Sequence, residues 1–174
     1  MFHKYRAPGG EERSWTLKEI VQGQPLRHPS HPMFVHFPVA YYIAVLVFDV
    51  MTRISPNPGL VFAATALIIG AFVASAFAVT TGLVDWSGMV RGSRKRRWAT
   101  THMLLQLTTF AFFAVSLILR FPNRHDPRAS ATWIVLEVLG VLVLLVGQWF
   151  GGTLVYEMGM RVRTSGAGEA DRPA

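Results

Sequence analysis

Four long stretches of the chain are almost free of charged residues, and this restricts the fold more than any other feature. They cover residues 33–48, 59–84, 98–119 and 131–156, and Glu137 is the one charge inside the last stretch. A helix needs about 20 apolar residues to cross a bilayer. The last three stretches reach that length, and the first does so if it continues to Met51. A soluble helix of this length would carry a polar face. The sequence therefore predicts an all-α integral membrane protein, a four-transmembrane-helix bundle.

The composition supports a membrane protein and excludes several kinds of site. Hydrophobic residues make up 51% of the chain and charged residues 16%, whereas soluble domains carry about a quarter charged residues. The chain has no cysteine, which excludes disulfides, thiolate ligands and covalent c-type haem attachment within it. The first apolar stretch follows a charged segment and lacks a cleavage site, so we expect no signal peptide.

The positive charges predict the orientation in the membrane. Of the 17 Lys and Arg residues, 13 lie in the N-terminal segment, the second loop and the C-terminal tail. The positive-inside rule then places both termini and the second loop in the cytoplasm, which fits a multi-pass protein of the bacterial inner membrane. The basic run from Arg91 to Arg97 is either a topogenic signal or a binding patch for anionic lipid. The net charge of +7 is explained by this topology, so we expect no nucleic-acid partner.

The chain divides into three parts, and we see no internal repeat. Residues 1–30 form a cytoplasmic segment, disordered over residues 1–13, with a short amphipathic interfacial helix over residues 17–22 that Thr16 and Glu19 can cap. Residues 31–160 form the transmembrane domain. Residues 161–174 form a disordered cytoplasmic tail.

The first transmembrane helix is expected to begin near residues 34–38. The prolines between residues 24 and 32 disfavour regular helix before that point, while Pro38 is tolerated in a first turn. Near the far end of this helix, Asp49 and Arg53 are spaced to form an ion pair.

Small residues recur every four positions on the second helix and predict a close helix contact. They are Gly70, Ala74, Ala78 and Gly82. Such a smooth stripe lets another backbone approach. We also expect structural roles for Trp86, Gly151 and Gly152.

Polar and flexible residues from all four helices converge at one membrane face. Because alternate helices run in opposite directions, the following residues share the inner leaflet: His31, His36, Gly82, Asp85, Trp86, His102, Gly151, Gly152 and Tyr156. On the fourth helix, Glu137 and Gln148 share a face. Ionisable groups inside a bilayer are costly and usually face the bundle interior, paired with a partner.

The histidines leave two interpretations open. In the first, His36 and His102 are axial ligands of haem b, with His31 and Tyr156 beside the cofactor, or His36, Asp85 and His102 hold a metal ion. In the second, the histidines bind only protein groups, such as a backbone carbonyl freed by Pro38, and His36 and Asp85 hydrogen-bond directly. The cofactor remains unknown, with haem b the named candidate.

Several short motifs at these positions resemble a known family. The stretches HPSHPMFVHFPVA, TGLVDW, TTHMLL and GGTLVYEMGMRV resemble the bacterial membrane-protein family called domain of unknown function 2231, over about residues 24–163. The resemblance implies a four-helix integral membrane domain, sometimes fused to Rieske or cytochrome c modules, and it implies no established reaction. The matching residues are His31, Pro32, His36, Pro38, Gly82, Asp85, Trp86, His102, Gly151, Gly152 and Tyr156.

These observations favour an accessory subunit of a membrane redox assembly, respiratory or photosynthetic, with other membrane subunits as partners. A stand-alone b-type cytochrome-like module is the alternative. A small transporter or proton path through Glu137, Gln148 and the histidines is less favoured, because broken-helix signals are missing. The chain shows no P-loop, dinucleotide fingerprint or hydrolase triad, so we do not expect an independent enzyme.

Overall fold

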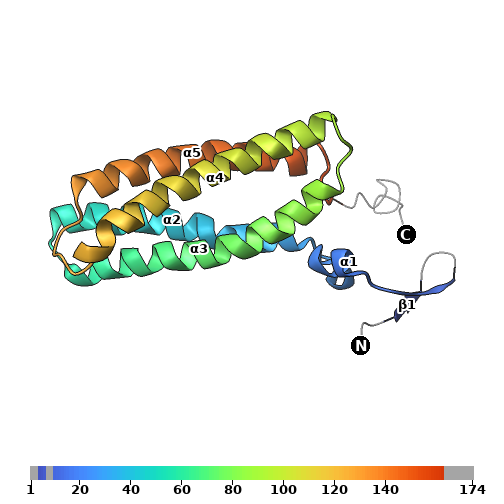
Figure 1. Cartoon of the computed structure of the whole chain (residues 1–174), viewed down its shortest axis with the longest axis horizontal. Helices are drawn as coiled ribbons and strands as arrows, with labels where there is room; N and C mark the ends of the chain where they lie inside the picture. The colour runs from blue at the N-terminus through green and yellow to red at the C-terminus, as the bar shows by residue number, and fades with distance from the viewer. Residues whose placement is uncertain (1–3, 7–9, 163–174) are drawn as a thin grey trace, which may run out of the picture.

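Four long helices form an elongated bundle in the computed structural model, which describes residues 4–6 and 10–162 (Figure 1). They are α2 (Ser30–Ile54), α3 (Pro58–Ser87), α4 (Arg94–Arg120) and α5 (Ala131–Tyr156). Each is long and apolar enough to cross a membrane. The prediction of an all-α integral membrane protein with four transmembrane helices is therefore confirmed.

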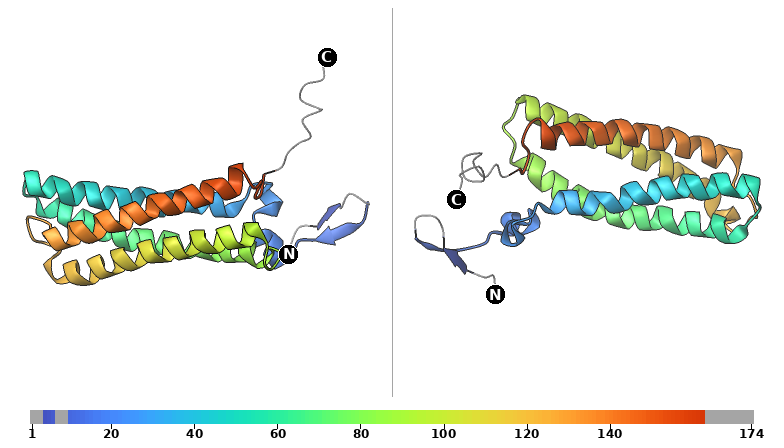
Figure 2. Two further views of the ribbon diagram at one scale, coloured as in Figure 1. Left: turned by 90° about the horizontal axis from the view of Figure 1, so that it is seen from above. Right: turned by 180° about the vertical axis from the view of Figure 1, so that it is seen from behind.

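The bundle consists of two helical hairpins. Helix α2 packs along α3, and α4 packs along α5, whereas contacts between the two hairpins are sparser (Figures 1 and 2). We call the end where α2 begins and α5 ends the proximal end, and the opposite end the distal end. The terminal segments lie at the proximal end (Figure 1). The core between the hairpins includes Tyr42, Val45, Ile68, Phe113 and Leu144.

Helix α2 begins earlier than the prolines predicted. It starts at Ser30 rather than near residues 34–38, and only Gln24–Leu26 before it forms a separate 3₁₀ turn, η1. Pro32 lies in the first turn, where backbone N–H groups have no helical partner, so it costs little there. Pro38 consequently lies inside the helix and is buried. Because of this earlier start, His31 belongs to the helix, and the helix fixes the direction of the His31 side chain.

The other long helices begin at polar caps. The Asn57 side chain accepts from Gly59 and Leu60 at the start of α3, Ser93 accepts from Arg96 at α4, and Ser130 accepts from Thr132 at α5. Such caps satisfy N–H groups that lack intrahelical partners. A second 3₁₀ turn, η2 (Phe121–Asn123), follows α4.

The N-terminal segment is more ordered than predicted. Helix α1 (Leu17–Val21) has the capping box of Thr16 and Glu19, as expected. Instead of disorder before it, strands β1 (Lys4–Arg6) and β2 (Glu12–Ser14) pair in an antiparallel hairpin. At the other terminus, Arg161 is fixed by a salt bridge to Asp85, and the predicted disordered tail from residue 163 onward lies outside the described residues.

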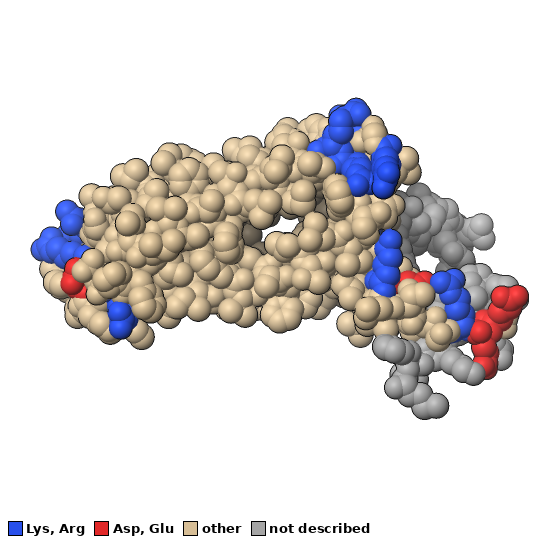
Figure 3. Space-filling view, viewed as in Figure 1, with Lys and Arg blue, Asp and Glu red and all other residues tan. Residues whose placement is uncertain are grey.

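Charged side chains gather at the two ends of the bundle. Figure 3 shows Lys and Arg at both ends and a broad uncharged belt between them. This distribution matches a protein whose middle lies in the apolar part of a bilayer.

Candidate functional site

His31 enters the bundle from the first turn of α2 and lies against α3. Its Nδ1 is 2.8 Å from the carbonyl oxygen of Ala78. The imidazole lies directly over Gly82, where an added Cβ would be 2.9 Å from the ring carbon Cε1. Only glycine leaves room for the ring at this point.

His102 occupies the equivalent place in the second hairpin. Its Nδ1 is 2.8 Å from the carbonyl oxygen of Gly147 on α5. The ring lies over Gly151, where an added Cβ would be 3.0 Å from Cε1. In both hairpins, the accepting carbonyl lies four residues, about one helical turn, before the glycine that the ring covers.

The two imidazoles come from opposite hairpins and approach each other between them. Their ring centroids are 6.4 Å apart, and their planes are nearly perpendicular, at 89°. A carbonyl oxygen can only accept a hydrogen bond, so each Nδ1 must carry the proton. In the neutral ring, Nε2 then has a free lone pair, and no described residue hydrogen-bonds to either Nε2. This is the tautomer in which histidine binds metals, with the second nitrogen held by a carbonyl.

The separation of the rings matches that of two imidazoles on one metal ion. Two metal–nitrogen bonds of about 2 Å, plus about 1 Å from each nitrogen to its ring centre, give centroids about 6 Å apart. The described part of the chain contains no group of three His, Asp or Glu side chains that could hold a metal ion. Two histidines alone therefore suit a metal ion whose remaining ligands belong to a cofactor rather than to the protein.

The hairpins separate over part of the proximal half of the bundle. They contact each other closely through Tyr42 with Phe113 and Phe72 with Phe110, both pairs with ring centroids 4.2 Å apart. Figure 3 shows an opening that passes through the molecule between the α2–α3 and α4–α5 hairpins, in the proximal half. Because His31 and His102 come from opposite hairpins, a group held by both imidazoles would lie between the hairpins.

His36 does not share this site. The five helical steps from His31 to His36 turn the helix by about 140° beyond a full turn. Its side chain is accordingly exposed at the bundle surface. The structure therefore pairs His102 with His31 rather than with His36, the partner that we expected.

Asp85 and Tyr156 also lie outside the histidine pair. Asp85 is buried and accepts from Arg161 through Nε at 3.0 Å and Nη2 at 2.5 Å. The expected hydrogen bond between His36 and Asp85 is not formed among the described residues. Tyr156 is 89% exposed, so its ring cannot contact a group inside the bundle.

The small-residue positions mostly face α2. Gly70 lies beside the Tyr41 ring, Ala78 and Gly82 contact His31, and Ala74 between them is half-buried. Gly152, unlike Gly151, has only the Tyr156 ring within 4.0 Å of an added Cβ. The stripe therefore serves the α2–α3 contact.

Trp86 joins α3 to α4 at the proximal end. Its indole nitrogen donates to the Thr100 hydroxyl at 3.0 Å. The Arg96 guanidinium lies 3.9 Å from the centre of the Trp86 ring. This cation–π contact occupies one arginine of the basic loop.

A second polar site, which the sequence did not predict, lies near the distal end. Asp49, Arg120 and Glu137 have no solvent exposure. Arg120 Nη2 donates to Asp49 Oδ2 and, at 3.1 Å, to Glu137 Oε1. Ser116 donates to the same Glu137 oxygen at 2.9 Å, and the guanidinium lies 5.0 Å from the Trp133 ring centre. We call Asp49, Arg120 and Glu137 the buried ion cluster.

The cluster replaces the predicted pair of Asp49 with Arg53. Arg53 instead donates to the backbone carbonyl of Ala129 at 3.3 Å. Spacing of three or four residues reveals only pairs within one helix. Arg120 follows the third apolar stretch, so we expected it to lie in a loop. Its partner Asp49 lies 71 residues away in the sequence.

The two hairpins are related by an internal repeat that the sequence did not reveal. His31 and His102, Tyr42 and Phe113, and Asp49 and Arg120 are each 71 positions apart, and each pair is in contact. Equivalent residues that touch must lie near a pseudo-twofold axis. The axis therefore runs along the bundle, between the hairpins and through all three contacts.

Comparison with known proteins identifies a family. A family model described as "Predicted membrane protein (DUF2231)" matches residues 27–164, which includes all four long helices and both polar sites. No curated protein and no solved structure matches the chain. With four membrane-spanning helices and a match over most of its length, the chain belongs to the DUF2231 family of predicted membrane proteins.

Proposed function

We propose that this protein is a membrane-embedded haem-binding module in which His31 and His102 are the axial ligands of a b-type haem. One observation carries the proposal: two imidazoles from different hairpins face each other with centroids 6.4 Å apart, each held through Nδ1 by a backbone carbonyl. Both Nε2 atoms are thereby available as ligands. The iron of a six-coordinate haem has four further ligands, which the porphyrin supplies and the described side chains do not.

The surroundings of the two histidines support a flat apolar cofactor. Gly82 and Gly151 leave space only for the imidazole rings, which fixes their positions along the bundle. Figure 3 shows an opening between the hairpins in the proximal half of the bundle, and a porphyrin held by His31 and His102 would lie between the hairpins there. When bound, haem would supply one-electron transfer.

The proposed setting is a redox assembly in the bacterial inner membrane, with this chain as a small accessory subunit beside other membrane subunits. Both termini would be cytoplasmic, because 13 of the 17 Lys and Arg residues belong to the N-terminal segment, the loop between α3 and α4, and the C-terminal tail. The histidine pair would then lie near the inner surface. The basic loop would contact anionic lipid through Arg91 and Lys95, since Arg94 and Arg96 lie over tryptophan rings and Arg97 donates to the Gly92 carbonyl.

Optical spectroscopy of the purified protein tests the haem assignment. The protein, expressed with haem supplementation, should show the reduced-minus-oxidised difference spectrum of a low-spin b-type haem. His31→Ala and His102→Ala should each abolish the six-coordinate spectrum. His36→Ala is the matched control and should retain it, because His36 is exposed on another face. A colourless protein that also fails to bind added haemin would contradict the proposal.

A purely structural role for the histidines is the second candidate. It is favoured by the two hydrogen bonds from Nδ1, which by themselves join α2 to α3 and α4 to α5. In that case, His31→Ala and His102→Ala would lower the melting temperature of a protein that binds no haem. The protein would then be a cofactor-free accessory subunit.

A further inference from the structure

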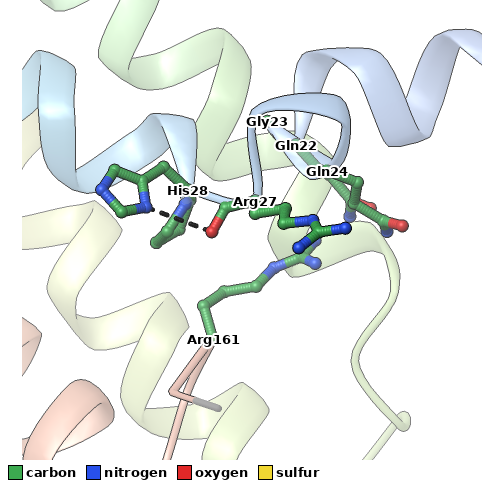
Figure 4. A pocket seen from close by; sticks show the side chains of 7 residues that line it. Gln22, Gly23, Gln24, Arg27, His28 and Arg161 are labelled. Atoms are coloured by element: carbon green, nitrogen blue, oxygen red, sulfur yellow. Dashed lines mark hydrogen bonds between the residues drawn. The ribbon is translucent and has the colours of Figure 1, made fainter.

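A cavity at the proximal end has the composition of an anion-binding site. It has a volume of about 150 Å³ and lies between the loop before α2 and the segment after α5. Its lining residues are Gln22, Gly23, Gln24, Arg27, His28, Pro29 and Arg161 (Figure 4). Two arginines, a histidine and two amides line it, and none of these residues is acidic.

The loop before α2 is folded tightly so that Arg27 is fixed beside the cavity. The Gly23 carbonyl accepts from Leu26 at 3.1 Å and from His28 at 3.3 Å. Gly23 has a positive φ of 75°, and an added Cβ would be 2.0 Å from the His28 carbonyl oxygen. The Ser30 hydroxyl donates to the Val21 carbonyl and holds the loop against α1. The loop is therefore a defined structure rather than a free linker.

Backbone strain in the described part of the chain is concentrated at this cavity. Within residues 4–6 and 10–162, the non-glycine residues with positive φ are Arg27, at 55°, and Arg161, at 60°. Both line the cavity, and Figure 4 shows their side chains directed toward the same part of it. Left-handed conformations are unfavourable for such residues and persist mainly where surrounding structure or function requires them.

The charges at the cavity are not balanced by protein groups. Asp85 neutralises Arg161, which donates to it through two nitrogens. Arg27 has no carboxylate partner among the described residues. His28 Nδ1 lies 3.1 Å from the Arg27 carbonyl, and Pro29, the N-cap residue of α2, provides no side-chain cap. Uncapped N–H groups at a helix start add partial positive charge.

We propose that this cavity binds a phosphate group, supplied either by the head group of an anionic lipid or by free phosphate. Arg27 provides the unpaired guanidinium, and Arg161, held by Asp85, provides the second. The cavity lies at the first turn of a membrane-spanning helix, where lipid phosphates are found. This site is separate from the histidine pair and does not depend on haem.

Two probes distinguish the sources of phosphate. Native mass spectrometry of the detergent-solubilised full chain would measure retention of phosphatidylglycerol against phosphatidylcholine. Thermal melting with added inorganic phosphate, against chloride at equal ionic strength, would measure binding of the free ion. Retention of phosphatidylglycerol assigns the site to lipid, and stabilisation by inorganic phosphate assigns it to the free ion. Neither effect, in the wild-type protein, would overturn the proposal.

Arg27→Gly and Arg27→Asn separate binding from folding. Both replacements accept a left-handed backbone more readily than arginine, so the melting temperature without ligand should be unchanged or higher. Loss of a charge-assisted hydrogen bond should weaken phosphate binding about tenfold or more. The matched control is Arg128→Asn, an exposed arginine at the distal end of the bundle, which should retain binding. Equal weakening in Arg128→Asn, or full binding in Arg27→Gly, would contradict the assignment.

Discussion

At the scale of single residues, the orientation of two side chains decides the candidate site. The sequence placed His31, His36 and His102 at one end of the bundle, because helix direction fixes depth, although it began the first helix after His31. It could not predict rotation about the helix axis. The helix begins at Ser30 and carries His31 inward, which leaves His36 exposed on another face. A start four residues later would have removed His31 from the helix altogether.

The glycines under the imidazoles give a prediction at this scale. Gly82→Ala and Gly151→Ala should each displace the neighbouring ring, because the new Cβ would be 2.9 or 3.0 Å from Cε1. Overpacking of this kind costs about 1–3 kcal/mol. We expect lower melting temperatures in detergent and a reduced haem content. Gly152→Ala, where an added Cβ meets only the Tyr156 ring at 4.0 Å, is the control and should change neither quantity.

At the scale of secondary-structure elements, the buried ion cluster joins α2, α4 and α5 near their distal ends. The helices themselves were predictable, because each is an apolar stretch of membrane-spanning length. Their connection was not, because Asp49 and Arg120 belong to different hairpins and Glu137 was expected only to share a helix face with Gln148. A buried charge in a membrane is retained only with partners, so each member of the cluster restricts where the other two helices can lie.

Removing the arginine should therefore destabilise the bundle more than removing the whole cluster. Arg120→Ala leaves two buried carboxylates without their cation, and breaking such an ion pair costs about 3–5 kcal/mol. Replacing all three charges, as in Asp49→Asn, Arg120→Met and Glu137→Gln together, should restore much of the melting temperature. Arg124→Ala, which loses a bond to the Phe121 carbonyl and a contact with the Phe121 ring, is the matched single control. A triple variant less stable than Arg120→Ala would contradict this account.

At the scale of the whole molecule, the chain is two similar hairpins facing each other across a pseudo-twofold axis. This repeat escaped the sequence analysis because equivalent residues differ in chemistry where they meet: Tyr42 contacts Phe113, and Asp49 contacts Arg120. Where equivalent residues meet on such an axis, complementary side chains give a more stable contact than identical ones. This holds above all for charged residues, because two identical charges would repel each other. Among the three contacts on the axis, the histidine pair alone has the same residue in both hairpins.

The repeat predicts that the hairpins can be made as separate chains. Each hairpin packs mainly within itself, and each consists of two apolar helices of membrane-spanning length joined at the distal end, so each can insert independently. Residues 1–91 and 92–174, co-expressed with a tag on the first, should therefore co-purify from detergent and recover the optical spectrum proposed for the intact protein. The break loses only short contacts of the loop between α3 and α4, such as the bond from Ser93 to the Val90 carbonyl.

Variants in the second half would show whether the native interface forms. Arg120→Ala should reduce co-purification, because the bond between Arg120 and Asp49 crosses the interface. Arg124→Ala should leave it unchanged, since its partner Phe121 lies in the same fragment. His102→Ala should leave co-purification largely intact while removing the spectrum, because the aromatic contacts of Tyr42 and Phe72 still join the hairpins. Halves that associate equally well with and without Arg120 would show that the pseudo-twofold interface is not the one that holds them together.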